Sequence, residues 1–390
     1  MTLTDTRPHT HGAGGTGSPS ERFTSRDPDA FEVPRGREEE WRFTPVRKLG
    51  ELFHPFTPDN SIRLEQDLPD GVEVTVVGRE DPRFGSVLTP ADRVSAVAMA
   101  QVERVLLVTV APGAVLDRPA VLRVVGSPGR NDAHVIIDAA AQSQGVIVLD
   151  HVGEATVAAN VEVRVGDGAQ LKVISVQDWA PGAIHLAAHA ARVGRDATYQ
   201  HTSVNLGGSI VRIVPTVRFA GPGGRAQLLG VAFAGEGQHL ESRLFVDHDE
   251  PQCSSDVLYK NALLGASART VWIGDVRIRP SAVGTDTYEM NRNLLLSDGA
   301  RADSVPNLEI ETGEIAGAGH ASATGRFDDL QMFYLQSRGI EADEAQRLVV
   351  RGFFAEVVER IGVPDLQHRI MSAIEARLGF TPNDLELESQ

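Results

Sequence analysis

Among the residues that can act as a nucleophile or bind a soft metal ion, the sequence contains a single cysteine. That residue, Cys253, lies in the segment DEPQCSSD, so disulfide frameworks and Cys-rich zinc or iron–sulfur sites within this chain are excluded. A role for the thiol as a nucleophile or metal ligand would require an exposed position and a lowered pKa. An inert loop cysteine is the simpler interpretation, and we favour it.

His320 lies in AGHASAT, residues 318–324, at the end of the last segment with strand character. A neutral imidazole is a suitable ligand for iron. Judged by chemistry alone, a single histidine is more often a structural or surface residue than a ligand. Its sequence context therefore decides the interpretation.

Three other patterns favour structural roles. Residues 247–250 (DHDE) resemble a hard-metal cluster, but neighbouring residues of a strand point to opposite faces, so we interpret them as a solvated acidic turn. His185 and His189 share one face of a strand, yet about 13 Å of strand rise separates them. The segment GPGG at 221–224 lacks the Lys-Ser/Thr of a phosphate-binding loop and predicts a corner.

The composition favours a β-rich core in a chain that does not bind nucleic acid. Hydrophobic residues make up 42% of the chain and aromatic residues only 5%, so Val, Leu, Ile and Ala, which suit stacked strands, must build the core. A formal net charge of −16 opposes binding to phosphate backbones. The chain lacks the long apolar run of a membrane helix and the layout of a signal peptide. We therefore predict no membrane association and a cytoplasmic location.

Residues 104–325 are predicted to form the core, because short β-type runs follow one another there with almost no helical period. A turn, an alanine and a strand recur, for example at Gly168-Ala169 and Asp196-Ala197. The recurrence is irregular, at roughly 30 to 40 residues, within the range of solenoid coils. We predict stacked coils that bury their apolar faces against one another, with a β-sandwich as the alternative fold. In the run SIVRIVPTVRF, alternation places Val211 on the buried face and Arg212 on the opposite one.

The N-terminal part differs from the core in composition. Residues 1–30 are rich in Gly, Ser, Thr and Pro and are predicted to form a disordered tail. Residues 31–103 are predicted to form a small helical region with one strand at 71–78. Thr44 and Thr89, each followed by proline, predict the starts of two short helices.

Residues 326–390 are predicted to form a C-terminal helical domain, because the apolar period changes there from 2 to 3.6 residues. Three helices are expected, at 327–338, 343–361 and 365–378, the first of them with acidic residues in its first turn. Apolar residues of the second helix fall on roughly one side and are predicted to be its buried face: Leu348, Val349, Phe353, Val357 and Ile361.

An ordered series of segments resembles the SufB/SufD family of iron–sulfur cluster assembly proteins, and within it the SufD branch. The resemblance extends over residues 34–380, and the FYL-x-SRGI segment is its most specific part. The segments that carry it are REEEWRFT (37–44), QLKVISVQ (170–177), NLLLS (293–297), PNLEI (306–310), the GH and GR pairs at 319–320 and 325–326, and FYLQSRGI (333–340).

This resemblance implies a mainly β fold, a right-handed parallel β-helix between helical ends. It also implies a scaffold complex with a SufB-like homologue and a SufC-like ABC-type ATPase. The chain has no Walker A sequence, so it would be a non-catalytic subunit, with ATP hydrolysis in the ATPase. Without the homologue, a homodimer is the expected assembly. The ATPase would bind the C-terminal helices through residues that include Phe333, Tyr334, Leu335, Arg338 and Phe353.

The resemblance further places His320 at the interface of the two β-helix proteins, as a ligand of iron or of an iron–sulfur cluster held there transiently. The family's usual run is Cys-Ser-His-Gly-Ala-Thr, whereas this chain has Ala318-Gly319-His320. The missing cysteine leaves sulfur ligation to the SufB-like partner. Cys253 falls where SufD relatives often have a cysteine, and it is the weaker metal-ligand candidate.

Two alternatives to this function are open. A purely structural partner-binding subunit would make His320 incidental. A carbohydrate-active β-helix enzyme would need clustered carboxylates and aromatic platforms for sugar; with 3 Trp, 4 Tyr and no conspicuous acid pair, it is the less favoured alternative.

Overall fold

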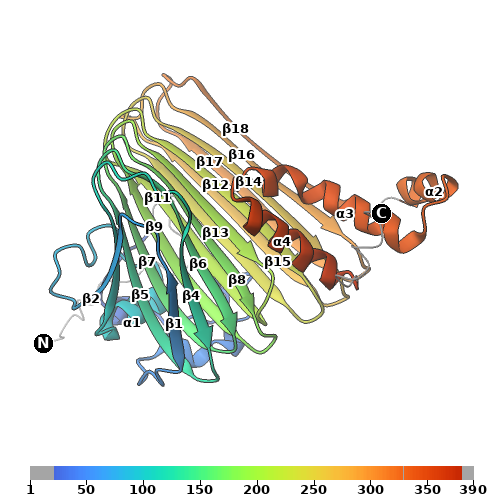
Figure 1. The fold of residues 1–390 in the computed structure, drawn as a ribbon, viewed down its shortest axis with the longest axis horizontal. Coiled ribbons are helices and arrows are strands. Elements are labelled where there is room, and N and C mark those ends of the chain that lie inside the picture. Colours follow the sequence, from blue (N-terminus) through green and yellow to red (C-terminus); the bar gives the residue numbers. More distant parts are fainter. Residues whose placement is uncertain (1–21, 328, 380–390) are drawn as a thin grey trace, which may run out of the picture.

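A computed structural model describes residues 22–327 and 329–379, and within these the side chains of 329–332 are left out. Its centre consists of two facing nine-stranded sheets (Figure 1). In spatial order the first sheet contains β1 (Ile62–Asp67), β4 (Ala120–Gly126), β6 (Gln144–Gly153), β8 (Gln170–Trp179), β10 (Thr198–Asn205), β12 (Arg225–Ala234), β14 (Ser254–Leu263), β16 (Asp286–Leu295) and β18 (Gly317–Arg326).

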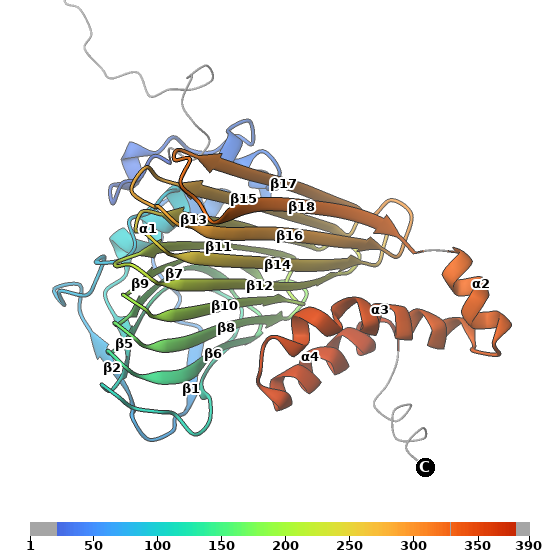
Figure 2. The same cartoon turned by 90° about the horizontal axis from the view of Figure 1, so that it is seen from above.

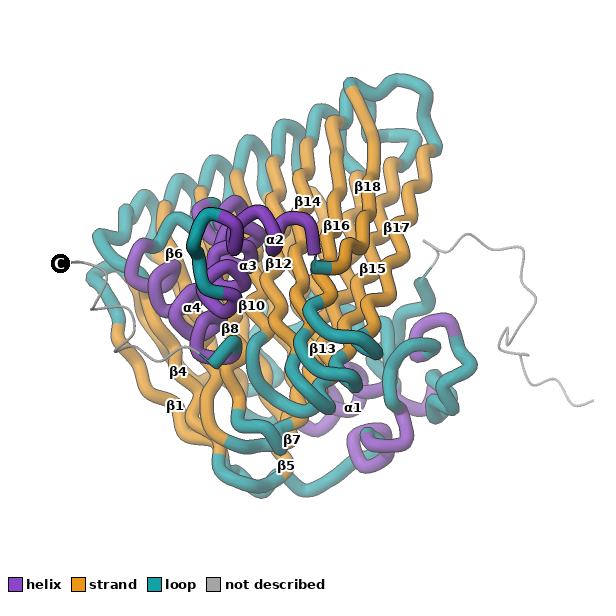
Figure 3. Tube along the Cα trace, turned by 90° about the vertical axis from the view of Figure 1, so that its right-hand side faces the viewer, coloured by secondary structure: helices purple, strands orange, loops and turns teal. Residues whose placement is uncertain are grey.

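The strands of the second sheet are stacked along the same axis as those of the first. From the C-terminal end, this sheet contains β17 (Arg301–Ile310), β15 (Arg269–Ile278), β13 (His239–His248), β11 (Ile210–Phe219), β9 (Ile184–Val193), β7 (Thr156–Val165), β5 (Arg130–Ala139), β3 (Val105–Val110) and β2 (Val72–Val77). From β3 onward the chain alternates between the sheets, so each pair of strands forms one coil (Figure 3).

All neighbouring strands pair in parallel, except that β1 pairs with β4, and β2 with β3, in antiparallel fashion. The predicted parallel β-helix is therefore confirmed, and the β-sandwich is excluded. The two antiparallel strands close the N-terminal end of the stack, where they provide partners for edges that would otherwise be open.

The turn and alanine at Gly168-Ala169 and Asp196-Ala197 mark corners that precede β8 and β10 of the first sheet. Two residues before six strands of this sheet, the backbone is left-handed, which turns the chain sharply; these residues are Gln142, Gly168, Asp196, Gly223, Gln252 and Gly284. The next residue is buried in every case and is usually small, for example Ala169 and Ala197. This corner fixes the register, since Gln170, Thr198 and Arg225 pair in line.

The core between the sheets is mainly aliphatic, with residues such as Val173, Val193 and Leu228 fully buried. The outer face of the first sheet is buried as well, because two helices, α3 (Ala342–Glu359) and α4 (Pro364–Arg377), pack on β12, β14 and their neighbours (Figure 2). The first C-terminal helix, α2 (Asp329–Ser337), lies beyond the end of α3. The three predicted C-terminal helices are thus present.

The buried side of α3 differs from the predicted one. Leu348 is 41% exposed, whereas Val350, Phe354 and Val357 are fully buried against the first sheet. The predicted and the observed apolar stripes overlap on this helix, because Val357 belongs to both. Contact with the sheet selects the stripe that contains Phe354.

The N-terminal segment covers the outer face of the second sheet. From residue 22 onward it contains four short 3-10 helices, η1 (Pro28–Ala30), η2 (Glu39–Trp41), η3 (Val46–Lys48) and η4 (Gly50–Phe53), and one α-helix, α1 (Arg93–Gln101). The strand predicted at 71–78 is β2, whereas the helix predicted from Thr44 is replaced by η3 and η4. The second predicted helix begins later than Thr89, because Asp92 caps α1 by accepting a hydrogen bond from the Ser95 backbone N–H (2.8 Å).

Residues 22–30 lie against the second sheet, in contrast to the tail predicted for residues 1–30. The guanidinium of Arg22 forms an ion pair with Asp275 and lies 4.5 Å from the ring centre of Phe245. Two charged and aromatic contacts therefore order a segment that its composition assigned to disorder. Residues 1–21 of that prediction lie outside the described residues.

Candidate functional site

The C-terminal end of the β-helix is open. β17 and β18 are the last strands of the two sheets, and in the described part of the chain each has a partner strand on one side only. They lie next to each other at this end (Figure 2). Six of the ten residues of β18 are exposed. Unpaired strand edges of this kind can accept a strand from another molecule.

His320 lies in the middle of this open end. Its position in β18 is in register with Glu289 of β16 and Val257 of β14, and Val257 belongs to the core between the sheets. The imidazole thus belongs to the inward face of the last coil, yet 44% of the side chain is exposed because no further coil covers it. His320 therefore lies within the last strand of the first sheet, whereas the sequence predicts it at the end of a strand.

Glu289 is the nearest acidic group to His320. Its Oε1 lies 3.8 Å from His320 Nδ1, which is too long for a hydrogen bond. The carboxyl group is 1% exposed, and among the described residues neither of its oxygens has a hydrogen-bond partner. Burial, with a smaller effect from the charge of Asp275, raises the pKa of Glu289 to about 8.

The space for this carboxyl group is provided by Gly274 of β15. A Cβ atom at Gly274 would lie 2.3 Å from Glu289 Oε2 and 2.5 Å from the Trp272 ring. Any larger residue at position 274 would therefore displace the carboxyl group or the indole.

The last coils carry further polar side chains on the same inward face. Asn293 of β16 donates hydrogen bonds to Asn291 Oδ1 (2.8 Å) and to Thr324 Oγ1 of β18 (3.1 Å). The hydroxyl groups of Ser304 and Ser322 are 2.7 Å apart and connect β17 to β18. Polar side chains, joined by hydrogen bonds between strands, thus line the inward face of the last coils around His320.

Cys253 occupies a corner of the β-helix. It precedes β14 directly, the position held by Ala169 before β8 and Ala197 before β10, and it is 1% exposed. Burial raises the pKa of the thiol to about 11. Both properties oppose the exposed, low-pKa thiolate that persulfide or iron contact would require, and they favour a packing role in the corner.

The remaining histidines of the core are hydrogen-bonded structural residues. His248 stacks on Phe219, with ring centres 4.9 Å apart, and its Nε2 lies 2.9 Å from Ser255 Oγ. His185 contacts Gln177 Oε1 (2.6 Å), and His189 contacts His201 (3.0 Å).

The segment 247–250 is divided between faces, as the alternation predicts, but the expected solvated turn is wrong, because Asp247 and His248 end strand β13 and are fully buried. Asp247 forms ion pairs with Arg218 and Arg279 on the outer side, while His248 lies inside. Within the described residues, no group of three or more His, Cys, Asp or Glu side chains is arranged to hold a metal ion.

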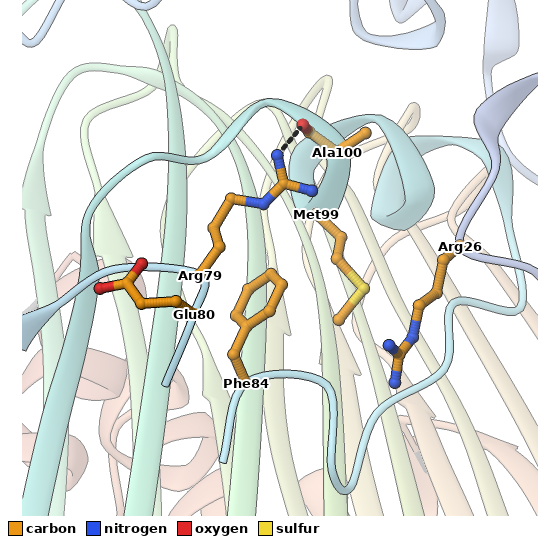
Figure 4. A pocket seen from close by; sticks show the side chains of 6 residues that line it. All are labelled: Arg26, Arg79, Glu80, Phe84, Met99 and Ala100. Atoms are coloured by element: carbon orange, nitrogen blue, oxygen red, sulfur yellow. Dashed lines mark hydrogen bonds between the residues drawn. The ribbon is translucent and has the colours of Figure 1, made fainter. Parts of the chain in front are cut away.

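A surface pocket beside α1 lies on the N-terminal part of the molecule and does not include His320 (Figure 4). Arg79 crosses it and donates a hydrogen bond to the Ala100 carbonyl (2.9 Å). The lining contains two arginines, one carboxylate and no histidine or cysteine, which makes it a poor metal site; its residues are Arg26, Arg79, Glu80, Phe84, Met99 and Ala100.

Comparison with known proteins assigns this architecture to a family. A family model described as the SufBD core domain of SUF system FeS cluster assembly matches residues 125–353. An iron–sulfur cluster assembly SufBD family protein of Mycobacterium tuberculosis (strain ATCC 25618 / H37Rv) is 51% identical over 371 residues, 93% of each chain. The chain belongs to the SufBD family. A SufBD family protein of Mycobacterium leprae (strain TN) is 50% identical over 371 residues, 92% of this chain and 94% of that protein.

The same Mycobacterium leprae strain contains a second, more distant relative of this SufBD chain. That protein, also named an iron–sulfur cluster assembly SufBD family protein, is 30% identical over 201 residues, 52% of this chain and 23% of the relative. One organism can thus hold two different SufBD proteins.

Sequence reasoning about this SufBD chain missed Glu289. The available signal is the alternation Thr287, Glu289, Asn291, Asn293, which puts four polar residues on one face of β16. From the sequence alone, such a polar face predicts exposure to solvent. Only the paired strands show that this face is turned inward and that the carboxyl group lies beside His320.

The C-terminal helices of the SufBD chain expose part of the predicted partner-binding set. Phe333 and Tyr334 of α2 are 70% and 57% exposed, and Arg338 lies over the Tyr334 ring, 5.2 Å from its centre. Phe353 is half-buried between helix and sheet, where its ring contacts Phe354 and its carbonyl accepts a hydrogen bond from Lys260 Nζ (2.9 Å). Among the helices of the described residues, none combines the length and apolarity needed to cross a bilayer.

Proposed function

We propose that this SufBD protein is the SufD-like subunit of an iron–sulfur cluster assembly scaffold and that its open β-helix edge binds a SufB-like homologue. His320 would then lie at the subunit interface and bind incoming iron or a nascent cluster. The observation that carries the proposal is an exposed imidazole on the inward face of the last, unpaired coil.

The pairing proposal is supported by the shape of that end. Each terminal strand offers a row of backbone N–H and C=O groups, and a second β-helix with a similar edge could continue both sheets. The presence of two SufBD proteins in one mycobacterial strain agrees with a heteromeric pair. A homodimer through the same edge is the alternative when the homologue is absent.

The residues present in this chain indicate which chemical steps would fall to its partners. The chain would be non-catalytic, with ATP hydrolysis in a SufC-like ATPase bound to the C-terminal helices. Because Cys253 is buried in a corner and the strand of His320 lacks a cysteine, sulfur ligands would come from the SufB-like partner. The cytoplasm is the compartment we expect for such a complex.

The decisive experiment compares His320→Ala with His368→Ala, a histidine exposed on α4. In the purified three-protein complex, H320A is expected to slow cluster assembly roughly tenfold or more, since loss of metal-site groups commonly costs at least that. H368A should leave the rate unchanged. Equal rates for wild type and H320A would leave a purely structural subunit as the better account.

A further inference from the structure

We propose that Glu289 is a second ligand contributed by this chain, so that a divalent iron ion is held between the Glu289 carboxylate and the His320 imidazole. This inference rests on the proposed function and adds a residue and a ligand set to it. The site would be completed by donor atoms from the partner subunit across the open edge.

The separation of the two groups favours a shared ion over a hydrogen bond. A distance of 3.8 Å between Glu289 Oε1 and His320 Nδ1 is too long for direct hydrogen bonding. Two donors bound to one tetrahedral metal ion at bond lengths of about 2.1 Å lie roughly 3.4 Å apart. A small movement of either side chain would bring both atoms to that separation.

The state of the carboxyl group points to a cation that the chain itself does not supply. Glu289 is 1% exposed, and among described side chains neither oxygen has a hydrogen-bond partner. A buried carboxyl without a partner is costly. Gly274 nevertheless leaves room for it at a position where a Cβ would lie 2.3 Å from Oε2. A divalent ion bound here would give the carboxyl oxygens the partner that the described side chains do not supply, and carboxylate and imidazole together suit ferrous iron.

The location explains why two donors from this chain would suffice. β18 is the last strand of its sheet, and His320 is 44% exposed at that edge. An ion between the two side chains would therefore face the surface that the partner covers. Remaining coordination positions would be open toward the partner, which suits iron that must be passed on rather than retained.

The test measures binding of Fe(II) alone to the full chain in complex with its SufB-like homologue, under anaerobic conditions and by competition with a chelator. Glu289→Gln keeps the shape and removes the charge, and Asp286→Asn is the matched control, because it makes the same change at an exposed position of the same strand. H320A provides the comparison for the proposed function. We expect E289Q to lower Fe(II) affinity about tenfold to a hundredfold, and D286N to leave it unchanged.

The outcomes separate the two claims. If H320A weakens Fe(II) binding and E289Q does not, the role of Glu289 is wrong and the proposed function stands. If neither variant weakens binding, the metal-site part of the proposed function fails together with this inference. A structural role is distinguished by two readouts: the thermal midpoint of E289Q without metal should not fall, and the visible spectrum of Co(II) bound in place of Fe(II) should change in E289Q but not in D286N.

Discussion

At the scale of single residues, the N-terminal segment is held by a buried cluster of charges centred on Arg212. The sequence places Arg212 on the solvent side of its strand. In the structure it is 1% exposed, because its guanidinium contacts Asp92 (2.9 Å), Glu241 (3.2 Å) and Glu40 and lies 4.3 Å from the Trp41 ring centre. The REEEWRFT segment thus supplies groups that cover the second sheet.

Replacing Arg212 with alanine is expected to destabilise the protein by about 3–5 kcal/mol, because it removes the buried cation that Asp92, Glu241 and Glu40 share. Urea unfolding measures the change. Arg42→Ala is the control, since Arg42 forms an exposed ion pair with Glu39 and its loss should cost under about 1 kcal/mol. Similar losses for the two variants would contradict the role assigned to the cluster.

Buried neutral histidines predict how stability depends on pH. Burial lowers the pKa of His248 to about 4, against a partial opposing effect of Asp247. Between pH 6.5 and 4 the unfolded chain therefore binds a proton that the folded chain does not, so stability is fully present above about pH 6.5 and declines as pH falls toward 4.

His248→Asn should flatten the profile of thermal midpoint against pH between 6.5 and 4, because it removes one of the groups responsible. His368→Asn, at an exposed position, should leave the slope as it is. If the slope of thermal midpoint against pH were the same in H248N as in the wild type, His248 would not be the buried, neutral group that the structure shows.

At the scale of elements, helix α3 is positioned by its contact with the first sheet. Phe354 is fully buried between α3 and the strands, while Leu348, which the helical period also favoured, is 41% exposed. Both patterns satisfy a period of 3.6 residues, so the sheet and not the helix determines which one is used.

Phe354→Ala is expected to cost about 3–5 kcal/mol, through lost burial and the cavity that remains. Leu348→Ala should change stability by no more than about 0.5 kcal/mol, as exposed substitutions usually do. Unfolding in urea distinguishes the two. A larger loss for L348A than for F354A would mean that α3 presents the other stripe to the sheet.

At the scale of the whole molecule, the β-helix separates two candidate binding surfaces. The open edge with His320 is at the end of the stack, and α2 with its exposed aromatic residues lies beyond the end of α3, on the side of the first sheet (Figure 2). The proposed homologue and the proposed ATPase would therefore bind different parts of the chain.

Phe333→Asp is expected to abolish co-purification of the ATPase while leaving the thermal midpoint and homologue binding unchanged, because Phe333 is 70% exposed and charge at the centre of an interface is strongly unfavourable. Val115→Asp is the control, since Val115 is similarly exposed, at 68%, on a loop outside the C-terminal helices. Retention of the ATPase by F333D would remove α2 from the proposed interface.

The sequence alone determined the kind of structure. Short β runs with recurring corners favoured stacked coils, because a strand with one apolar face must be buried by its neighbours, although the parallel strand pairing was needed to exclude a β-sandwich. The change of period near residue 326 predicted the helices that follow. Strand positions such as β8 and β11, the C-terminal helices and the candidate His320 follow from local pattern and resemblance.

Only the tertiary structure decided which polar groups are buried together. Arg212, Glu289 and Cys253 each have a local context that fits a different environment from the one they occupy, because burial depends on which segments cover a face and not on the residues next in sequence. Covering by the N-terminal segment buries Arg212, and the coil register turns Glu289 inward beside His320. Pairing between residues far apart in the chain is the physical information that a single sequence does not contain.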